Sequence, residues 1–295
     1  MTIQKISHPV LREAKNNIQL SMPLLTAWVI YSLSPFVGIA MISHLGPNVL
    51  AASVLVSTIW TAGTTFCFGI FHSVSVLVSH QFGAKNNQAI SEIMGQVFMM
   101  NMLSWIPVMI LIFCIPYFVQ WSAPNPEVLQ YATQYAHAIM WAAPGLIMLA
   151  MMEHFLSAIG RTKLSLWISI LEVPFEIIVL YILIYGKLGF PAMGIQGIGY
   201  GLAFCYAVTL IVLLIYLQFS RFTREYHIFR YFGKCKWHYW KEMLRIGLPV
   251  GLTSFIELVG FTIATYFISR YNQKRVLLAM EPTYCIQLKE IKEKQ

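Results

Sequence analysis

The chain has 295 residues, of which 58% are hydrophobic and only 11% are charged. Soluble domains carry about 25% charged residues, so this composition excludes a single water-soluble globule. The net charge of +8 does not indicate nucleic-acid binding, because the Lys and Arg residues fall almost entirely in the gaps between apolar blocks. The composition predicts an integral membrane protein.

Seven apolar blocks are long enough to cross a bilayer as α-helices, which takes about 20 residues each. They are expected at residues 18–42, 50–79, 93–119, 131–157, 164–185, 194–219 and 246–269. The first block is not read as a cleaved signal peptide, because a polar leader runs to Asn17 and no small-residue cleavage site follows the block. The predicted fold class is therefore all-α, a polytopic membrane protein.

Basic residues between the blocks predict which side of the membrane each connection faces. Of the connections before the seventh block, those at residues 1–17, around Lys85, around Arg161 and in a basic loop at 220–245 carry the Lys and Arg, whereas the alternate connections hold only Lys187. Because cytoplasmic loops are enriched in Lys and Arg, the amino terminus is expected inside, in a cytoplasmic (inner) membrane. The tail at 270–295 breaks the pattern, since it is basic yet should lie outside, and a solvated polar end is expected there.

Acidic residues inside the spans are the main candidates for function, because a charge at the bilayer centre costs at least about 2.5–3.5 kcal/mol. Glu257 lies 11 residues into the seventh block, near the membrane midplane. Glu172 and Glu176 are separated by one helical turn in the fifth block, so they share a face and repel if both are ionised. A shared proton or cation would relieve that repulsion. For all three, a structural polar role remains the alternative.

Other polar residues carry weaker signals. Glu153 and His154 lie near the expected cytoplasmic end of the fourth block, from which their side chains can reach water. His72 is expected to be a packing residue, and Cys235 with His238 has a ligand-like spacing without partners. The cysteines contain no CxxC motif and are expected as free thiols, namely Cys67, Cys114, Cys205, Cys235 and Cys285.

Motifs of energy-coupled enzymes are absent from the sequence. It contains no GxxxxGK[ST] nucleotide loop, no HExxH and no Ser, His and Asp grouping at helical spacing. The chain is therefore not expected to be an enzyme or to need a cofactor. The remaining driving force is an ion gradient, with Na⁺ or H⁺ as the coupling ion.

A weak internal repeat suggests a duplicated architecture. A shift of 226 residues aligns Lys15 with Lys241, Pro23 with Pro249 and Ile30 with Ile256, among five identities in 29 positions. Both segments place Pro early in a helix, where its missing N–H costs least. If the repeat is real, the seventh span opens a second six-helix unit, and a complete protein would need twelve helices and about 450 residues.

Five segments in order resemble the multidrug and toxic compound extrusion (MATE) transporters over about residues 18–270. They are HLGPNVLAAS, VLVSHQFGAKNNQAI, APGLIMLAMMEHFLSAIGRTKLSL, EIIVLYILIYGKLGFPAMGIQGIGYG and LRIGLPVGLTSFIEL. The resemblance implies the first six-helix bundle (18–219) of a twelve-helix fold, followed by the first helix of the second bundle (246–269). It implies a multidrug efflux transporter that exports cationic amphipathic compounds by antiport with sodium ions or protons.

The resemblance also assigns residues and marks departures. Glu257 is similar to the family's cation-coupling acidic residue in the seventh helix. Gly38 stands where many members have an Asp, and Leu180 stands where many have the Asp of an N-x-x-x-D pattern that begins at Glu176. Glu176 or Glu172 could replace the missing carboxylate of the first bundle.

Four other interpretations remain open at this stage. The first is an inactive truncated transporter fragment, and the second is a chain completed by a second copy or by a missing second bundle. The third is a lipid-linked oligosaccharide flippase of the same superfamily, which would need a cationic groove for phosphate. The fourth is a seven-helix sensor, which the span count alone suggests.

Overall fold

The computed structural model describes residues 7–122, 125–220, 226, 231, 233 and 235–260. These residues contain helices and turns but no strand, and seven helical segments are long and apolar enough to cross a membrane. The expected all-α fold with seven spans is thereby confirmed.

The spans follow one another in chain order as long helices, and two of them consist of more than one helical segment. They comprise α1 (Ser7–Ser43), α2 (Pro47–Gly83), α3 (Asn87–Phe113) with α4 (Ile115–Ser122), α5 (Pro126–Ile139) with the short 3₁₀ turn η1 (Met140–Ala142) and α6 (Ala143–Ala158), α7 (Thr162–Tyr185), and α8 (Ile195–Phe219). The seventh span is Trp237–Gly260, named helix 237–260 below.

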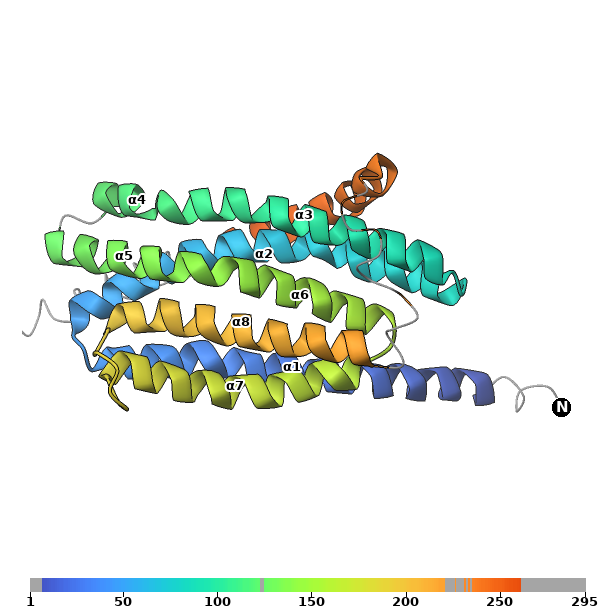
Figure 1. The fold of residues 1–295 in the computed structure, drawn as a ribbon, viewed down its shortest axis with the longest axis horizontal. Coiled ribbons are helices and arrows are strands. Elements are labelled where there is room, and N and C mark those ends of the chain that lie inside the picture. The colour runs from blue at the N-terminus through green and yellow to red at the C-terminus, as the bar shows by residue number, and fades with distance from the viewer. Residues whose placement is uncertain are drawn as a thin grey trace, which may run out of the picture.

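The helices lie side by side, and their connections alternate between the two ends of the bundle (Figure 1). α1 packs along α7, α2 packs against α5 and α6, and α8 lies against both α5 and α7. The first turns of α1 project beyond the other helices at the end where α2 joins α3 and α6 joins α7 (Figure 1). That end is the one predicted to be cytoplasmic.

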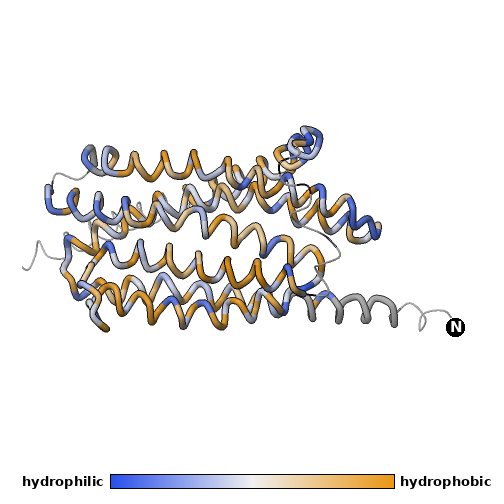
Figure 2. The backbone as a smooth tube through the Cα atoms, in the orientation of Figure 1, coloured by the Kyte–Doolittle hydropathy of each residue, from blue (hydrophilic) through white to orange (hydrophobic). Residues whose placement is uncertain are grey.

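Apolar residues cover the shafts of the helices, while polar residues gather toward their ends (Figure 2). Large side chains such as Trp28, Phe36, Trp167 and Leu171 are at least 61% exposed, and each lies on a spanning helix. Such exposure would be unfavourable in water and is expected where the solvent is lipid.

Several helices are longer than the apolar blocks that predict them. α1 begins at Ser7 instead of residue 18, and helix 237–260 begins at Trp237 instead of residue 246. Hydropathy measures the stretch that crosses hydrocarbon, and polar residues extend a helix beyond it. The predicted end of the seventh span at 269 and the tail at 270–295 lie outside the described residues.

Helix 237–260 docks on α2 through glycines. A Cβ atom on Gly69 of α2 would collide with the backbone of Gly251, and one on Gly247 would collide with the backbone of Ile70. Side chains are excluded from this crossing, so the two backbones approach closely, as in the small-xxx-small contacts of membrane helices. The seventh span is therefore packed on the first six.

Candidate cation site

Glu172 and Glu176 of α7 are buried in the bundle, with 4% and 3% of their surface exposed. One helical turn separates them, so both point to the same side of α7. That side meets α1, whose residues supply a partner for each carboxyl group. The contact between α1 and α7 therefore holds two acidic side chains away from lipid.

Tyr31 of α1 connects Glu172 to a third carboxyl group. Its hydroxyl oxygen lies 3.1 Å from Oε2 of Glu172 and 3.0 Å from Oε1 of Glu153 on α6. Three helices thus meet at one phenol. Four residues along α7, the Ser34 hydroxyl of α1 donates a hydrogen bond to Oε1 of Glu176.

The hydrogen count at Tyr31 limits the charge that this group of residues can carry. A phenol has one hydrogen and donates one hydrogen bond, while its oxygen accepts others. A full, linear hydrogen bond between Tyr31 and each carboxyl group requires that one of the two is protonated and donates to the Tyr31 oxygen. The geometry therefore suits two carboxyl groups that share one proton through a phenol.

Proline interrupts the hydrogen bonding of both helices at this level. Pro35 follows Ser34 in α1, and Pro174 lies between Glu172 and Glu176 in α7. Each proline lacks an N–H group, which leaves the carbonyl oxygen four residues earlier, on Tyr31 and on Ile170, without its helical donor.

The structure corrects one prediction about this region. Glu153 does not reach for water at the helix end; it is partly buried and accepts a hydrogen bond from Tyr31 of α1. Glu172 shares a face of α7 with Glu176, as the spacing predicts, and in addition contacts Tyr31. The missed residue, Tyr31, belongs to a different helix 122 positions from Glu153.

The two histidines form a pair that the sequence does not indicate. The His72 ring of α2 packs edge-on against the His154 ring of α6, with 5.5 Å between ring centroids. His72 is exposed and His154 is partly buried. His72 is therefore a packing residue whose partner is a second histidine.

Glu257 lies apart from the carboxyl groups of Glu153, Glu172 and Glu176. It is exposed on helix 237–260. The structure thus brings Glu172 and Glu176 together with α1 and leaves Glu257 facing outward. Gly38 stands where the resemblance places an Asp in many family members. It is buried, but no atom lies within 4 Å of the position that a Cβ would take.

Thiols and imidazoles form no metal centre in the part of the chain that is described. No group of three or more His, Cys, Asp or Glu side chains there is placed to hold a metal ion. Cys235 is exposed, and His238 Nε2 lies 3.2 Å from Glu242 Oε1 in the same helix. Cys67, Cys114 and Cys205 are also free thiols, and Cys285 lies outside the described residues.

Comparisons with known proteins identify the family. The family model MatE matches residues 23–182, which is more than half of the chain. The chain belongs to the MatE family. It is 28% identical over 242 residues to the "Probable multidrug resistance protein NorM" of Geobacillus kaustophilus, covering 82% of this chain and 53% of that protein.

Solved structures agree with this fold. An outward-facing multidrug resistance MATE family transporter matches with a TM-score of 0.74 at 21% identity, covering 86% of this chain and 54% of that one. The eukaryotic MATE transporter AtDTX14 matches with a TM-score of 0.75 at 18% identity, covering 86% of this chain and 56% of that one. The chain spans about half the length of the curated relatives it matches. It is therefore a multi-pass membrane protein with the fold of one half of a MATE transporter.

Proposed function

We propose that this protein takes part in multidrug efflux, exporting small cationic amphipathic compounds in exchange for an inward-moving cation that the carboxyl groups of the first bundle bind. The observation that carries the proposal is the bridge from Glu153 through Tyr31 to Glu172. Relatives named as multidrug resistance proteins support the class of substrate.

Electrostatics explain why this group of residues would respond to an ion gradient. Ionised carboxyl groups in apolar surroundings are costly, so protonation or a bound cation stabilises them. The number of protons or cations held then depends on which side of the membrane the group faces. The single hydrogen of the Tyr31 hydroxyl, placed between two carboxyl groups, supports a proton as the coupling cation.

The charge of the spans bears on the flippase alternative. Phosphate binding would require Lys or Arg inside the bundle, and the basic residues lie in connections or near helix ends. The buried ionisable groups are instead acidic, as suits a cationic substrate. The proposal therefore favours drug export over transport of a lipid-linked sugar.

Alternating access requires two bundles that rock against each other around a midplane site. In this proposal the second bundle is supplied by a second copy of the chain or by a further segment. In either case α1 and helix 237–260 lie at the interface between the two bundles. Lipid covers the remaining outer surface, and no nucleic acid takes part. The expected location is the cytoplasmic (inner) membrane with the amino terminus inside.

Accumulation of a fluorescent lipophilic cation in efflux-deficient bacteria tests the proposal. Cells that express the native chain should accumulate less dye than cells with Glu172→Gln, because the amide cannot load and release a proton. Glu127→Gln is the matched control: Glu127 is exposed and accepts a hydrogen bond from Asn48 at the opposite end of the bundle. It should export like the native chain.

Purified protein supplies a second measurement that does not depend on a complete transport cycle. Tetraphenylphosphonium added to weakly buffered protein should release protons from the native chain and from Glu127→Gln, and fewer from Glu172→Gln. Equal dye levels in all cells together with equal proton release from all three proteins would refute the proposal.

A further inference from the structure

One face of α3 receives the chain that leads into helix 237–260. Glu92 and Gln96 are one helical turn apart on α3, and Gly95 directly precedes Gln96. A Cβ atom on Gly95 would come within 2.8 Å of the carbonyl carbon of Tyr231, so the Tyr231 backbone lies directly on α3. The glycine lets the incoming chain reach both polar side chains.

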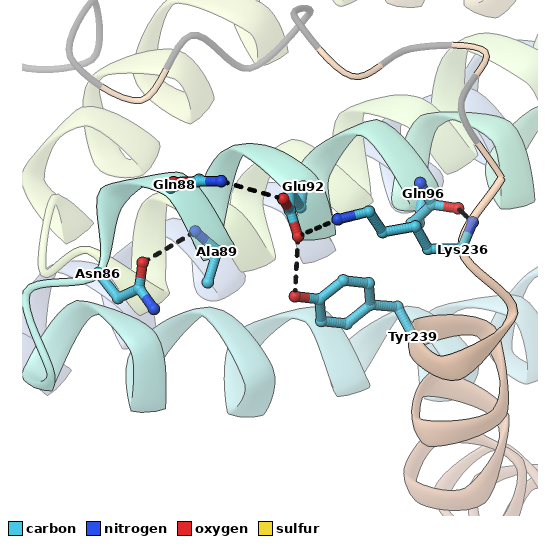
Figure 3. Close-up of polar contacts among 7 residues, drawn as sticks. All are labelled: Asn86, Gln88, Ala89, Glu92, Gln96, Lys236 and Tyr239. Carbon is cyan, nitrogen blue, oxygen red and sulfur yellow. Dashed lines mark hydrogen bonds and ion pairs between the residues drawn. The ribbon is translucent and has the colours of Figure 1, made fainter.

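Gln96 and Glu92 each hold two groups of the incoming segment, and Figure 3 shows those of Lys236 and Tyr239. Gln96 Oε1 accepts hydrogen bonds from the Lys236 backbone N–H at 2.8 Å and from Trp240 Nε1 at 3.1 Å. Glu92 Oε2 lies 2.6 Å from Lys236 Nζ and accepts a hydrogen bond from the Tyr239 hydroxyl at 3.2 Å. These five residues are named the α3 clamp.

The helix continues from the α3 clamp onto α2 in an antiparallel direction. Gly247 meets Ile70, and one turn later Gly251 meets Phe66 and Gly69. One turn earlier, the fully buried Met243 falls at the level of Ser73, which is also fully buried. Helix 237–260 therefore seals this end of α2 and α3 from the α3 clamp to the glycine crossing.

The two attachments differ in chemistry. The glycine crossing is a close backbone contact, which fixes a point of approach. The ion pair of the α3 clamp lies at the water boundary, because the side chain of Lys236 is 44% exposed and that of Glu92 is 12% exposed. Water can replace the partners of such a pair at small cost. The clamp is thus the part of the contact that can open reversibly.

We propose that the α3 clamp is the gate at the predicted cytoplasmic end, and that substrate enters only after Glu92 releases Lys236 and Tyr239. The gate rests on the proposed function, because alternating access moves the bundle that begins with helix 237–260 against the first bundle. The structure then represents the state closed at this end, and the glycine crossing is the pivot about which the helix swings.

Thiol labelling in inside-out vesicles tests the gate. Ser73→Cys, in a chain whose exposed Cys235 is replaced by Ser, places a reporter under helix 237–260, and a water-soluble maleimide is added. Adding Glu92→Gln should raise the labelling rate about threefold to fivefold, as loss of an ion pair near the surface allows. Glu242→Gln is the matched control, because Glu242 lies in the same helix and its ion pair is with His238 of that helix, not with α3.

Two further results decide the interpretation. Exchanging the charges, with Glu92→Lys and Lys236→Glu together, should restore slow labelling. Equal labelling with and without Glu92→Gln would overturn the gate, and so would a rise accompanied by labelling of the buried Cys67, since the clamp would then only maintain the fold. A native chain that exports no dye but shows the predicted labelling would refute the proposed function and leave the gate intact.

Discussion

Tyr31 is the residue at which carboxyl groups from two helices meet, and its hydroxyl can be removed without changing the shape of the ring. Tyr31→Phe should reduce proton-dependent dye export by about tenfold, because a hydrogen bond to a charged group contributes about 1.5–3 kcal/mol. Export is measured in vesicles with an imposed pH gradient.

Tyr185→Phe is the control for Tyr31→Phe. The Tyr185 hydroxyl also joins α7 to α1, through the carbonyl oxygen of Met41 at 2.8 Å, but it contacts no carboxyl group in the structure. It should leave the response to pH unchanged. Similar losses in both variants would mean that Tyr31 only holds α1 against α7.

Gly38 is a second residue with a measurable consequence, because its helical position is buried but has open space for a side chain. Gly38→Ala should raise the free energy of unfolding by about 0.5–1 kcal/mol, the usual difference between Gly and Ala inside a helix. Thermal unfolding of the purified protein measures it. A lower melting temperature would contradict the open space at this position.

At the scale of residues, the acidic side chains inside spans could be predicted, but their partners could not. Glu172 and Glu176 stand out because carboxyl groups are rare in apolar helices. Glu153 carries the same signal, but its nearness to a helix end predicts a side chain that reaches water. Tyr31 gives no signal at all, since one tyrosine among the 15 in the chain gains its role only when α1 packs on α7 and brings its hydroxyl to Glu153 and Glu172.

At the scale of elements, the crossing of helix 237–260 and α2 contains a glycine whose replacement should destabilise the protein, in contrast to Gly38→Ala. Gly69→Ala should lower the free energy of unfolding by about 1–3 kcal/mol, because the new methyl group meets the backbone of Gly251, which has no rotamer to adopt. Thermal unfolding again measures the change.

Gly83→Ala provides the matched control on α2, because no atom lies within 4 Å of the position of its Cβ. It should unfold at or above the native temperature. Equal melting temperatures for Gly69→Ala and Gly83→Ala would show that the two helices can separate without cost.

The number and order of the spans could be predicted because apolar blocks of 20 residues have few other folds. Their ends could not, since Ser7–Asn17 and Trp237–Arg245 are polar or mixed segments that become helical by continuing a helix already formed. The contacts of the α3 clamp also escaped prediction. Glu92 and Gln96 look like ordinary polar residues near a helix end until the incoming chain lies on them.

At the scale of the whole molecule, the alternating connections predict a single orientation. A membrane-impermeant maleimide added to intact cells should not label the native, exposed Cys235, whereas permeabilised cells should show labelling. In a separate chain with Cys235→Ser, Leu188→Cys should be labelled in intact cells, because Leu188 is 83% exposed in the connection at the other end. The reverse pattern would place the amino terminus outside.

The carboxyl proton that Glu153 and Glu172 share through Tyr31 has a spectroscopic consequence. A protonated carboxyl group and an ionised one absorb infrared light at different frequencies, so the proton held by this group of residues has its own band. That band should move when water is exchanged for deuterium oxide and should disappear in the double variant Glu153→Gln with Glu172→Gln. The occupancy of the proton could then be followed in membranes, with neither substrate nor transport.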